Sequence, residues 1–474
     1  MILQCAEATF KFSAKVGSFG GVGKERPLKT FNMVWKHSHR FCFKALRKVR
    51  NFAAMKKSNM KIRLCLMLFV AWACCDGARA GRISFAKADS LLAQRNPVLR
   101  SARLDVTVAE GLLTQSRSYD NPTVNVMYNV QNPTNRRWFD PGSTGEVDVQ
   151  VSQPFAIGGQ HAEQVRQNTS LLNASYSQLL VTQRDLRTEV HTAMIALYYQ
   201  QRQARVYDEE IASAEKILTA CREQSEKGNV AAMETQRIAT MVYQLRKSQT
   251  DLLLEAAALE TQLRQLLALP GIEPITVDLD EQAAVAQASR LYLTLHSDES
   301  PVLDTLPEMQ LSDHRAEAAQ HALRWQHSQS LPQMAVQGEY DKNGSIGHNY
   351  FAVGLSVAVP LWNRNRGNIR SAQATLEQAA IDKEQQRLAL TLQRQTDLDI
   401  VGKYLKQLAE PASSLDKDLS QMLLAAEQQF MSRHISLVEF VDLYINYRDT
   451  MLAHLDAQSK MLQAAERLKV VWIR

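Results

Sequence analysis

Long stretches of the chain repeat their apolar residues with a period of 3.5, which is the spacing of helices that coil around one another. Stepping alternately by four and three residues from Leu172 to Cys221 reaches 15 positions, and 13 of them are apolar when alanine is counted. A second stretch keeps the same period at eight of nine positions. Residues 160–227 contain neither glycine nor proline, so a single helix of about 100 Å could cover them. The pattern predicts long coiled helices over 160–227 and 229–269.

Four shorter segments alternate apolar and polar residues strictly, as half-buried β-strands do. They cover residues 122–131, 145–154, 332–341 and 350–360. Each is about ten residues long, which is the length that a tilted transmembrane strand needs. A soluble sandwich shows the same alternation, but strands separated by helices of 40 to 68 residues cannot form a sandwich core. A membrane barrel closed by several subunits leaves no free sheet edge.

Aromatic residues lie near the ends of these four predicted strands. They are Tyr128, Trp138, Phe139, Tyr340, Tyr350 and Trp362. Membrane barrels carry aromatic girdles at both interfaces, so the set favours a membrane barrel.

The two halves of the chain repeat the same order of elements. Three pairs of prolines lie 210, 210 and 206 residues apart: Pro97 with Pro307, Pro122 with Pro332, and Pro154 with Pro360. The predicted parts are a first repeat over 81–269, an inter-repeat segment over 270–306, and a second repeat over 307–474 with long helices over 367–431 and 435–474. Pro411 is expected to kink or break the first of those two helices.

The positive charge of the chain is concentrated at its beginning. The 474 residues have a formal net charge of +6, but the first 80 contain 16 Lys and Arg against three acidic residues. The remaining residues carry 39 basic against 46 acidic side chains, a net charge of −7. A basic protein suggests a nucleic-acid partner, and this distribution removes that expectation from the main part of the chain. The apolar content of 45% excludes a disordered chain.

Residues 55–80 have the pattern of an export signal peptide. A basic end is followed by the apolar run 64–75 and by Ala78-Arg79-Ala80, which has the form of a cleavage site. Twelve apolar residues are too few for a transmembrane helix. Residues 1–54 are interpreted as an upstream extension that is absent from the mature protein. A lipoprotein signal at Cys74 or Cys75 is disfavoured because no Leu stands three residues earlier, but the sequence does not decide whether the mature N-terminus is lipidated.

The expected mature chain contains no signature of catalysis or of a bound cofactor. It lacks a phosphate-binding loop, H-E-x-x-H, C-x-x-C and G-x-S-x-G, so we predict no enzyme, no cofactor and no metal site. Its single cysteine, Cys221, falls on the apolar seam of a predicted helix. The other five cysteines precede residue 81: Cys5, Cys42, Cys65, Cys74 and Cys75. The histidines are scattered, and we interpret them as ordinary helix residues.

With these features the chain resembles the TolC family of outer-membrane efflux ducts over residues 82–474. The resemblance rests on the duplicated prolines, the segment Ser84–Ala88 with the following Leu91–Ala93 and Asn96–Leu99, and the turn Pro154–Gln160. The segment 360–369, Pro-Leu-Trp-Asn-Arg-Asn-Arg-Gly-Asn-Ile, resembles the subfamily that serves heavy-metal pumps of the resistance-nodulation-division class.

The resemblance implies a mainly α-helical homotrimer with a membrane β part. Each subunit would give four strands to one 12-stranded outer-membrane barrel, and its long helices to a tunnel through the periplasm. The function implied is that of a passive exit duct in a tripartite efflux system, with metal cations as the expected solutes. The implied partners are a periplasmic adaptor, an inner-membrane pump and outer-membrane lipid, with no nucleic acid.

The resemblance also implies two groups of functional residues. Residues at the periplasmic turns would dock on the adaptor: Lys227, Gly228 and Asn229 at the first turn, and Arg433 and His434 at the second. Acidic residues just past the turns would narrow the entrance: Glu234, Glu439 and Asp442. Threefold symmetry would make each of these carboxylates a ring that favours cations. An ordinary exposed helix face remains the alternative. The arginine that latches the entrance is not clearly matched, with Arg237 and Arg433 as nearby candidates.

Two other functions remain open at this point. A duct of the same architecture could export drugs or secreted polypeptides. A soluble periplasmic coiled-coil scaffold or adaptor would need the four alternating segments to be dispensable.

Overall fold

The structure is a computed structural model, and it describes residues 82–132, 135–297, 303–344, 346–409 and 415–472. The chain divides into two units, Met1–Arg79 and Ala80–Arg474, and the described residues belong to the second. The predicted leader and upstream extension, the first five cysteines and Pro411 lie outside the described residues.

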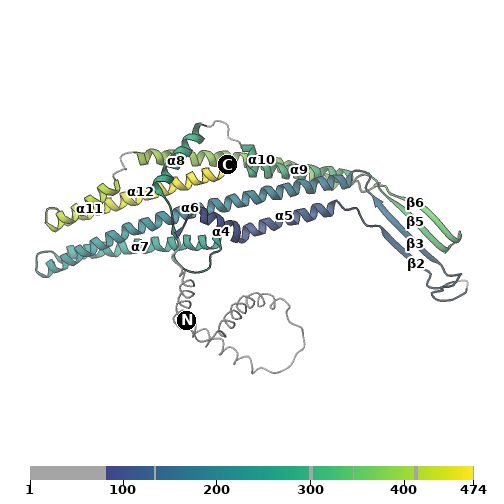
Figure 1. Ribbon diagram of the computed structural model, residues 1–474, viewed down its shortest axis with the longest axis horizontal. Helices are drawn as coiled ribbons and strands as arrows, with labels where there is room; N and C mark the ends of the chain where they lie inside the picture. The colour runs from purple at the N-terminus through teal and green to yellow at the C-terminus, as the bar shows by residue number, and fades with distance from the viewer. Residues whose placement is uncertain (1–81, 133–134, 298–302, 345, 410–414, 473–474) are drawn as a thin grey trace, which may run out of the picture. The chain divides into compact units, whose positions relative to one another are not determined.

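Helices make up most of the second unit (Figure 1). In chain order the elements are β1 Arg82–Ile83, α4 Phe85–Arg95, α5 Pro97–Ser116, β2 Thr123–Tyr128, β3 Val147–Phe155, α6 Gln160–Glu226, α7 Ala232–Leu267, β4 Thr276–Val277, α8 Glu281–Ser297, the 3₁₀ turn η1 Leu303–Thr305, α9 Pro307–Ser328, β5 Gln333–Gly344, β6 Gly347–Ala358, α10 Arg366–Ala409, α11 Leu415–Met431 and α12 Leu437–Trp472. Within the part of the chain that the structure describes, no helix is long and apolar enough to cross a membrane.

Local sequence signals set where several helices begin. At the start of α5 the Asn96 side chain accepts a hydrogen bond from the Leu99 N–H at 2.9 Å, and Pro97 is the first helical residue. The Asn96 side chain also donates to the Leu266 carbonyl of α7 at 2.7 Å. Before α6, Gly159 adopts a positive φ of 78°, a conformation that glycine reaches without steric cost.

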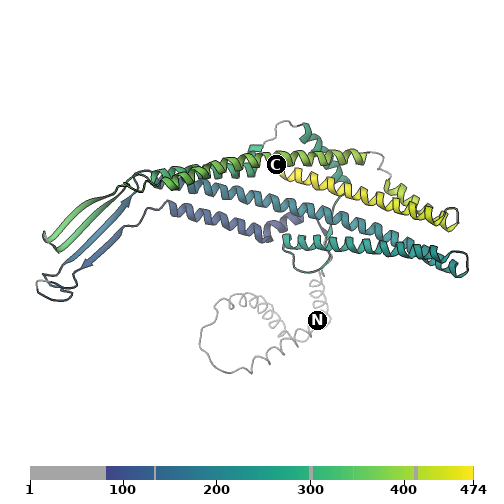
Figure 2. The same ribbon diagram turned by 180° about the vertical axis from the view of Figure 1, so that it is seen from behind.

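The long helices lie side by side in a row (Figures 1 and 2). α6 contacts α5, α7, α9 and α12, while α10 contacts α9 and α12. Three apolar clusters hold the row together. One joins α4, α5, α6 and α7; a second joins α6, α8, α10 and α12; the third joins α6, α7, α11 and α12 close to the two helical turns.

Four strands form one antiparallel sheet in the order β2-β3-β5-β6 at the end of the helices opposite the α6–α7 and α11–α12 turns (Figure 1). Val151 pairs with Val124 on one side and with Gly338 on the other, and Gly338 pairs with Val353. Paired residues share a face, so the aliphatic residues of the strands collect on one face. The opposite face carries polar partners such as Asn125, Gln150 and Glu339.

The apolar face of this sheet is exposed rather than covered by helices. Val353 in β6 is 85% exposed and Leu355 is 60% exposed. β2 and β6 are the two outer strands, and among the described residues neither has a partner on its outer edge. A sheet in a soluble protein buries its apolar face, whereas the strands of a transmembrane barrel turn theirs toward lipid, and the exposure of this face is typical of the second case.

Candidate functional site

The turn between α6 and α7 is a helix C-cap of the Schellman type. Gly228 has a positive φ of 77°, and its N–H donates to the Ser225 carbonyl at 3.0 Å. The Asn229 N–H donates to the Gln224 carbonyl at 2.9 Å, and the Asn229 side chain donates to the Gln224 side chain at 2.9 Å. Lys227 is exposed beside them. The predicted first docking turn is therefore a sharp reversal with its polar groups on the surface.

The turn between α11 and α12 has the same geometry with a different residue at its centre. The Arg433 N–H donates to the Phe430 carbonyl at 2.9 Å, and the His434 N–H donates to the Gln429 carbonyl at 2.8 Å. Arg433 occupies the position of Gly228, with a positive φ of 59°. A side chain in this conformation costs roughly 1–2 kcal/mol relative to glycine. Arg433 and His434 are exposed, so the strained backbone places a cationic side chain at the surface of the second turn.

Glu439 is held by the start of its own helix. Its carboxylate accepts hydrogen bonds from the Ser436 N–H at 2.7 Å and from the Ser436 hydroxyl at 2.8 Å, and the Glu439 N–H donates back to that hydroxyl at 3.3 Å. This reciprocal pair is a capping box. The hydrogen bond from the Ser436 backbone is the main reason why the pKa of Glu439 lies below its ordinary value. The pattern Ser-x-x-Glu in the sequence was the signal for this role.

The other two predicted entrance residues have freer carboxylates. Glu234 is exposed in the first turn of α7, and Asp442 is exposed on α12, where it accepts a hydrogen bond from the Asn446 side chain at 3.2 Å. Within the described residues, neither Arg237 nor Arg433 forms an ion pair with them. The structure brings the first turns of α7 and α12 to one end of the row but does not identify a latch (Figure 1).

An aromatic cluster fixes the helices just behind the two turns. Phe440 of α12 is 1% exposed, and its ring lies 5.0 Å from that of Phe430 and 5.1 Å from that of Tyr444. The Tyr444 hydroxyl donates to the Glu210 carbonyl of α6 at 2.8 Å. These contacts join α11, α12 and α6, so the position of the carboxylates predicted to line an entrance depends on them.

Glu210 is a buried acid that the sequence analysis did not single out. Its side chain is 0% exposed, and among the described residues neither carboxylate oxygen has a hydrogen-bond partner. Burial raises the pKa of Glu210 to about 8, while the nearby Arg448 opposes the rise and Asp449 adds to it. The side chain is therefore neutral at pH 7. α12, more than 200 residues further along the chain, buries it, and no local pattern indicates that contact.

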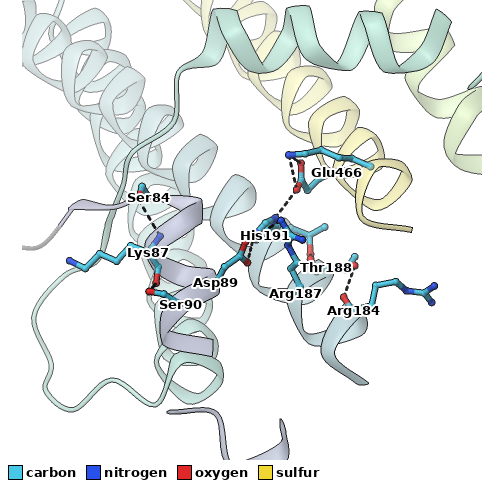
Figure 3. Close-up of polar contacts among 11 residues, drawn as sticks. Ser84, Lys87, Asp89, Ser90, Arg184, Arg187, Thr188, His191 and Glu466 are labelled. Atoms are coloured by element: carbon cyan, nitrogen blue, oxygen red, sulfur yellow. Dashed lines mark hydrogen bonds and ion pairs between the residues drawn. The ribbon is translucent and has the colours of Figure 1, made fainter. Parts of the chain in front are cut away.

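A second missed group surrounds His191, which is 1% exposed (Figure 3). Its Nε2 lies 2.8 Å from Asp89 Oδ1 of α4, and its Nδ1 lies 2.6 Å from Glu466 Oε1 of α12. Arg187 pairs with Asp89 at 3.1 Å, and Lys469 pairs with Glu466 at 3.2 Å. An imidazole that faces a carboxylate at each nitrogen donates from both, so His191 is an imidazolium. The group joins α4, α6 and α12.

The charge of His191 makes this junction depend on pH. Burial lowers the pKa of His191, but the hydrogen bonds that its ring donates to Asp89 and Glu466 outweigh this effect, and the net shift is upward. For Asp89 and Glu466, burial opposes the shift, yet the hydrogen bond with His191 brings both pKa values below their ordinary range. The stabilisation is therefore complete between about pH 4.5 and 6.5. It is lost as pH rises through the raised pKa of His191, or falls through the lowered pKa values of the carboxyl groups.

Replacing His191 with Gln is expected to lower the stability by about 2 kcal/mol at pH 6, because two charge-assisted hydrogen bonds are lost. The difference from wild type should shrink as pH rises through the raised pKa of His191, because the wild-type imidazolium then loses its proton. Thermal unfolding in detergent across this pH range measures the effect. His161→Gln changes a histidine that stacks on Tyr119 and serves as the control. A deficit that keeps the same size after the wild-type imidazolium has lost its proton would contradict the prediction.

Comparisons with known proteins show which family the chain is similar to. The model of the family described as "Outer membrane efflux protein" matches residues 89–269. The nickel-cobalt-cadmium resistance protein NccC of Alcaligenes xylosoxydans xylosoxydans is 25% identical over 256 residues, which cover 51% of this chain and 55% of that protein. The chain thus spans about half the length of that relative. The cobalt-zinc-cadmium resistance protein CzcC of Cupriavidus metallidurans is 22% identical over 395 residues, or 82% of this chain and 86% of that protein.

Solved structures show the same fold. CusC has a TM-score of 0.66 at 14% identity, with 82% of this chain and 91% of that chain covered. The outer membrane protein VceC of Vibrio cholerae has a TM-score of 0.63 at 14% identity, with 81% and 95% covered. The predicted fold class, long helices with four strands per subunit, is confirmed. The chain is therefore similar to the outer membrane efflux protein family over residues 89–269, and it has the same fold as CusC and VceC.

Proposed function

We propose that this protein is a passive outer-membrane exit duct for divalent metal cations, supplied by an inner-membrane pump through a periplasmic adaptor. The observation that carries the proposal is the four-stranded sheet, which is apolar and exposed on one face, polar on the other, and open at both edges. The names of NccC and CzcC, which describe resistance to nickel, cobalt, cadmium and zinc, support metal cations as solutes. The duct performs no chemical reaction, so it is not an enzyme.

The proposed assembly is a homotrimer. β2 and β6 each expose an unpaired edge, which a neighbouring copy can satisfy. α5 and α10, separated by α6 and α9 in Figures 1 and 2, expose apolar side chains on their surfaces. Those of α5 are Leu104, Val108 and Leu112, and those of α10 are Ile381, Leu388 and Leu392. Three copies with four strands each would close a 12-stranded barrel, and the two apolar surfaces would meet between subunits.

In this assembly the turns would touch the adaptor and the acidic residues would line the entrance. Lys227, Gly228 and Asn229 at the first turn, and Arg433 and His434 at the second, present their side chains or backbone at one end of the helices. Glu234 and Asp442 have carboxylates outside a helix cap, so they are the stronger candidates for cation-attracting rings. Glu439 adds charge while it caps α12.

A deletion strain tests the proposal directly. Loss of the gene should make cells sensitive to cobalt, zinc, cadmium or nickel while their drug tolerance is unchanged, and the gene on a plasmid should restore growth. Sensitivity to drugs with normal metal tolerance would favour the duct for drugs or polypeptides instead. Release of the mature protein by osmotic shock without detergent would favour the soluble scaffold.

The entrance carboxylates can be tested by conductance in planar bilayers. We expect Asp442→Asn and Glu234→Gln to reduce cation selectivity severalfold, because each removes three charges from the trimer. Glu439→Gln removes the charge but keeps the capping box, since Gln serves at this position too. Ser436→Ala weakens the cap without changing the charge and is the matched control. Unchanged selectivity in Asp442→Asn and Glu234→Gln would remove both residues from the pore.

A further inference from the structure

The segment between β6 and α10 is a turn fixed to the end of α9. Asn365 has a positive φ of 55°, and its side chain donates to the Gln326 carbonyl at 2.8 Å and to the Gln326 side chain at the same distance. The Asn365 N–H donates to the Asn363 side chain at 3.1 Å, and the Asn368 side chain donates to that of Asn365 at 2.7 Å. The asparagines of this turn therefore hold the backbone, and they leave the residues between them on the surface.

This turn exposes a tryptophan at the point where the apolar face of the sheet ends. Trp362 is 92% exposed, and Leu361 beside it is 59% exposed. Leu361 continues the alternation of Val357, in the apolar row of β6, and Val359, the first residue after that strand. Tryptophan is enriched where hydrocarbon meets headgroups, because its ring is apolar and its N–H is polar.

Three arginines follow within eight residues of Trp362. Arg364, Arg366 and Arg370 are all exposed, and in the described part of the chain none of their guanidinium groups has a hydrogen-bond or ion-pair partner. Further along the same helix the arginines are engaged: Arg387 pairs with Asp304, and Arg394 donates to the Leu295 carbonyl at 2.9 Å. Unpaired charge is thus a property of this end of α10, not of the whole helix.

The chemistry of these side chains fits one ligand. Guanidinium groups bind phosphate through paired N–H donors, and basic clusters next to membrane segments bind anionic lipid headgroups. An exposed indole one turn away fits the boundary between acyl chains and headgroups. We propose that Trp362, Arg364, Arg366 and Arg370 form a binding site for the headgroup of anionic phospholipids in the periplasmic leaflet of the outer membrane. The inference rests on the proposed function, since it requires the sheet to lie in that membrane.

Native mass spectrometry of the purified protein tests this site. The probe is an equal mixture of phosphatidylglycerol and phosphatidylethanolamine with identical acyl chains. Wild type should retain phosphatidylglycerol in preference, and the preference should fall about fivefold for each arginine changed to Gln, so that the triple variant loses nearly all of it. The triple Arg→Lys variant keeps the charge and should keep part of the preference.

The matched control removes three exposed arginines elsewhere: Arg222→Gln, Arg237→Gln and Arg290→Gln. These lie on α6, α7 and α8 without a side-chain partner among the described residues, and the control should keep the wild-type preference. An equal loss in the control, or no preference in wild type, would overturn the lipid site. Absence of wild-type protein from the outer-membrane fraction would instead overturn the proposed function, so the two failures are distinguishable.

Discussion

Glu210→Gln is expected to stabilise the protein by about 3 kcal/mol at pH 7 and by about 5 kcal/mol at pH 9. The unfolded carboxyl has a pKa of about 4.5, whereas the pKa in the folded protein is about 8. Because the pKa is raised, the group must take up a proton when the protein folds. Each pH unit between the two pKa values therefore lowers the free energy of unfolding by about 1.4 kcal/mol. This loss of stability therefore begins above pH 4.5, grows until about pH 8 and then stays constant. Glutamine has the same shape and carries no charge, so it avoids the penalty.

Thermal unfolding in detergent at pH 4, 7 and 9 measures this effect. Wild type and Glu210→Gln should unfold at nearly the same temperature at pH 4 and diverge as pH rises. Glu209→Gln is the matched control, because Glu209 is the exposed neighbour on the same helix and should change little. A gain in Glu210→Gln that is equal at pH 4 and pH 9 would show that the charge of Glu210 is not its cause.

Phe440→Ala is expected to destabilise the end of the helical row by about 3–5 kcal/mol. The ring is fully buried between Phe430 and Tyr444, so its removal leaves a cavity that the packed helices cannot fill. The loss should be local, because Phe440 belongs to the apolar cluster of α6, α7, α11 and α12 near the turns. Amide hydrogen exchange should therefore accelerate in α11 and the start of α12, with little change in the sheet.

Val438→Ala provides the comparison for Phe440→Ala. Val438 lies two residues earlier on the same helix and is 56% exposed, so its truncation should cost less than 1 kcal/mol. Faster exchange spread evenly over the whole unit in Phe440→Ala would contradict a local role for the aromatic cluster.

Several features of the fold were readable in the sequence because local rules set them. The absence of glycine and proline predicted a helix over 160–227, where the structure has Gln160–Glu226. Strict alternation predicted strands over 122–131 and 145–154, where the structure has Thr123–Tyr128 and Val147–Phe155. Asn96 and Pro97 predict the start of a helix, because Asn is preferred at the N-cap and Pro at the first helical position. The family resemblance from the same segments was confirmed by the match over residues 89–269.

The roles of charged residues were less predictable, because they depend on partners far along the chain. Glu439 was assigned to the entrance, and the structure adds a capping role that its spacing from Ser436 had signalled. The entrance and docking assignments themselves stay predictions. His191 looked like an ordinary helix histidine until Asp89 and Glu466, 102 and 275 residues away, were seen at its two nitrogens.

The periods of 3.5 for the long helices and two for the strands could be predicted from the sequence, because each depends on residues close together in the chain. The repeat of the whole unit is visible in the spacing of its prolines. Which side chains lose contact with water depends instead on how distant helices pack. Glu210 and Glu209 are adjacent and chemically identical, yet Glu210 is buried without a hydrogen-bond partner for its carboxylate in the described part of the chain, and Glu209 is exposed. The packing of α12 against α6 makes that difference, and it gives one carboxyl group a pKa that depends on the fold.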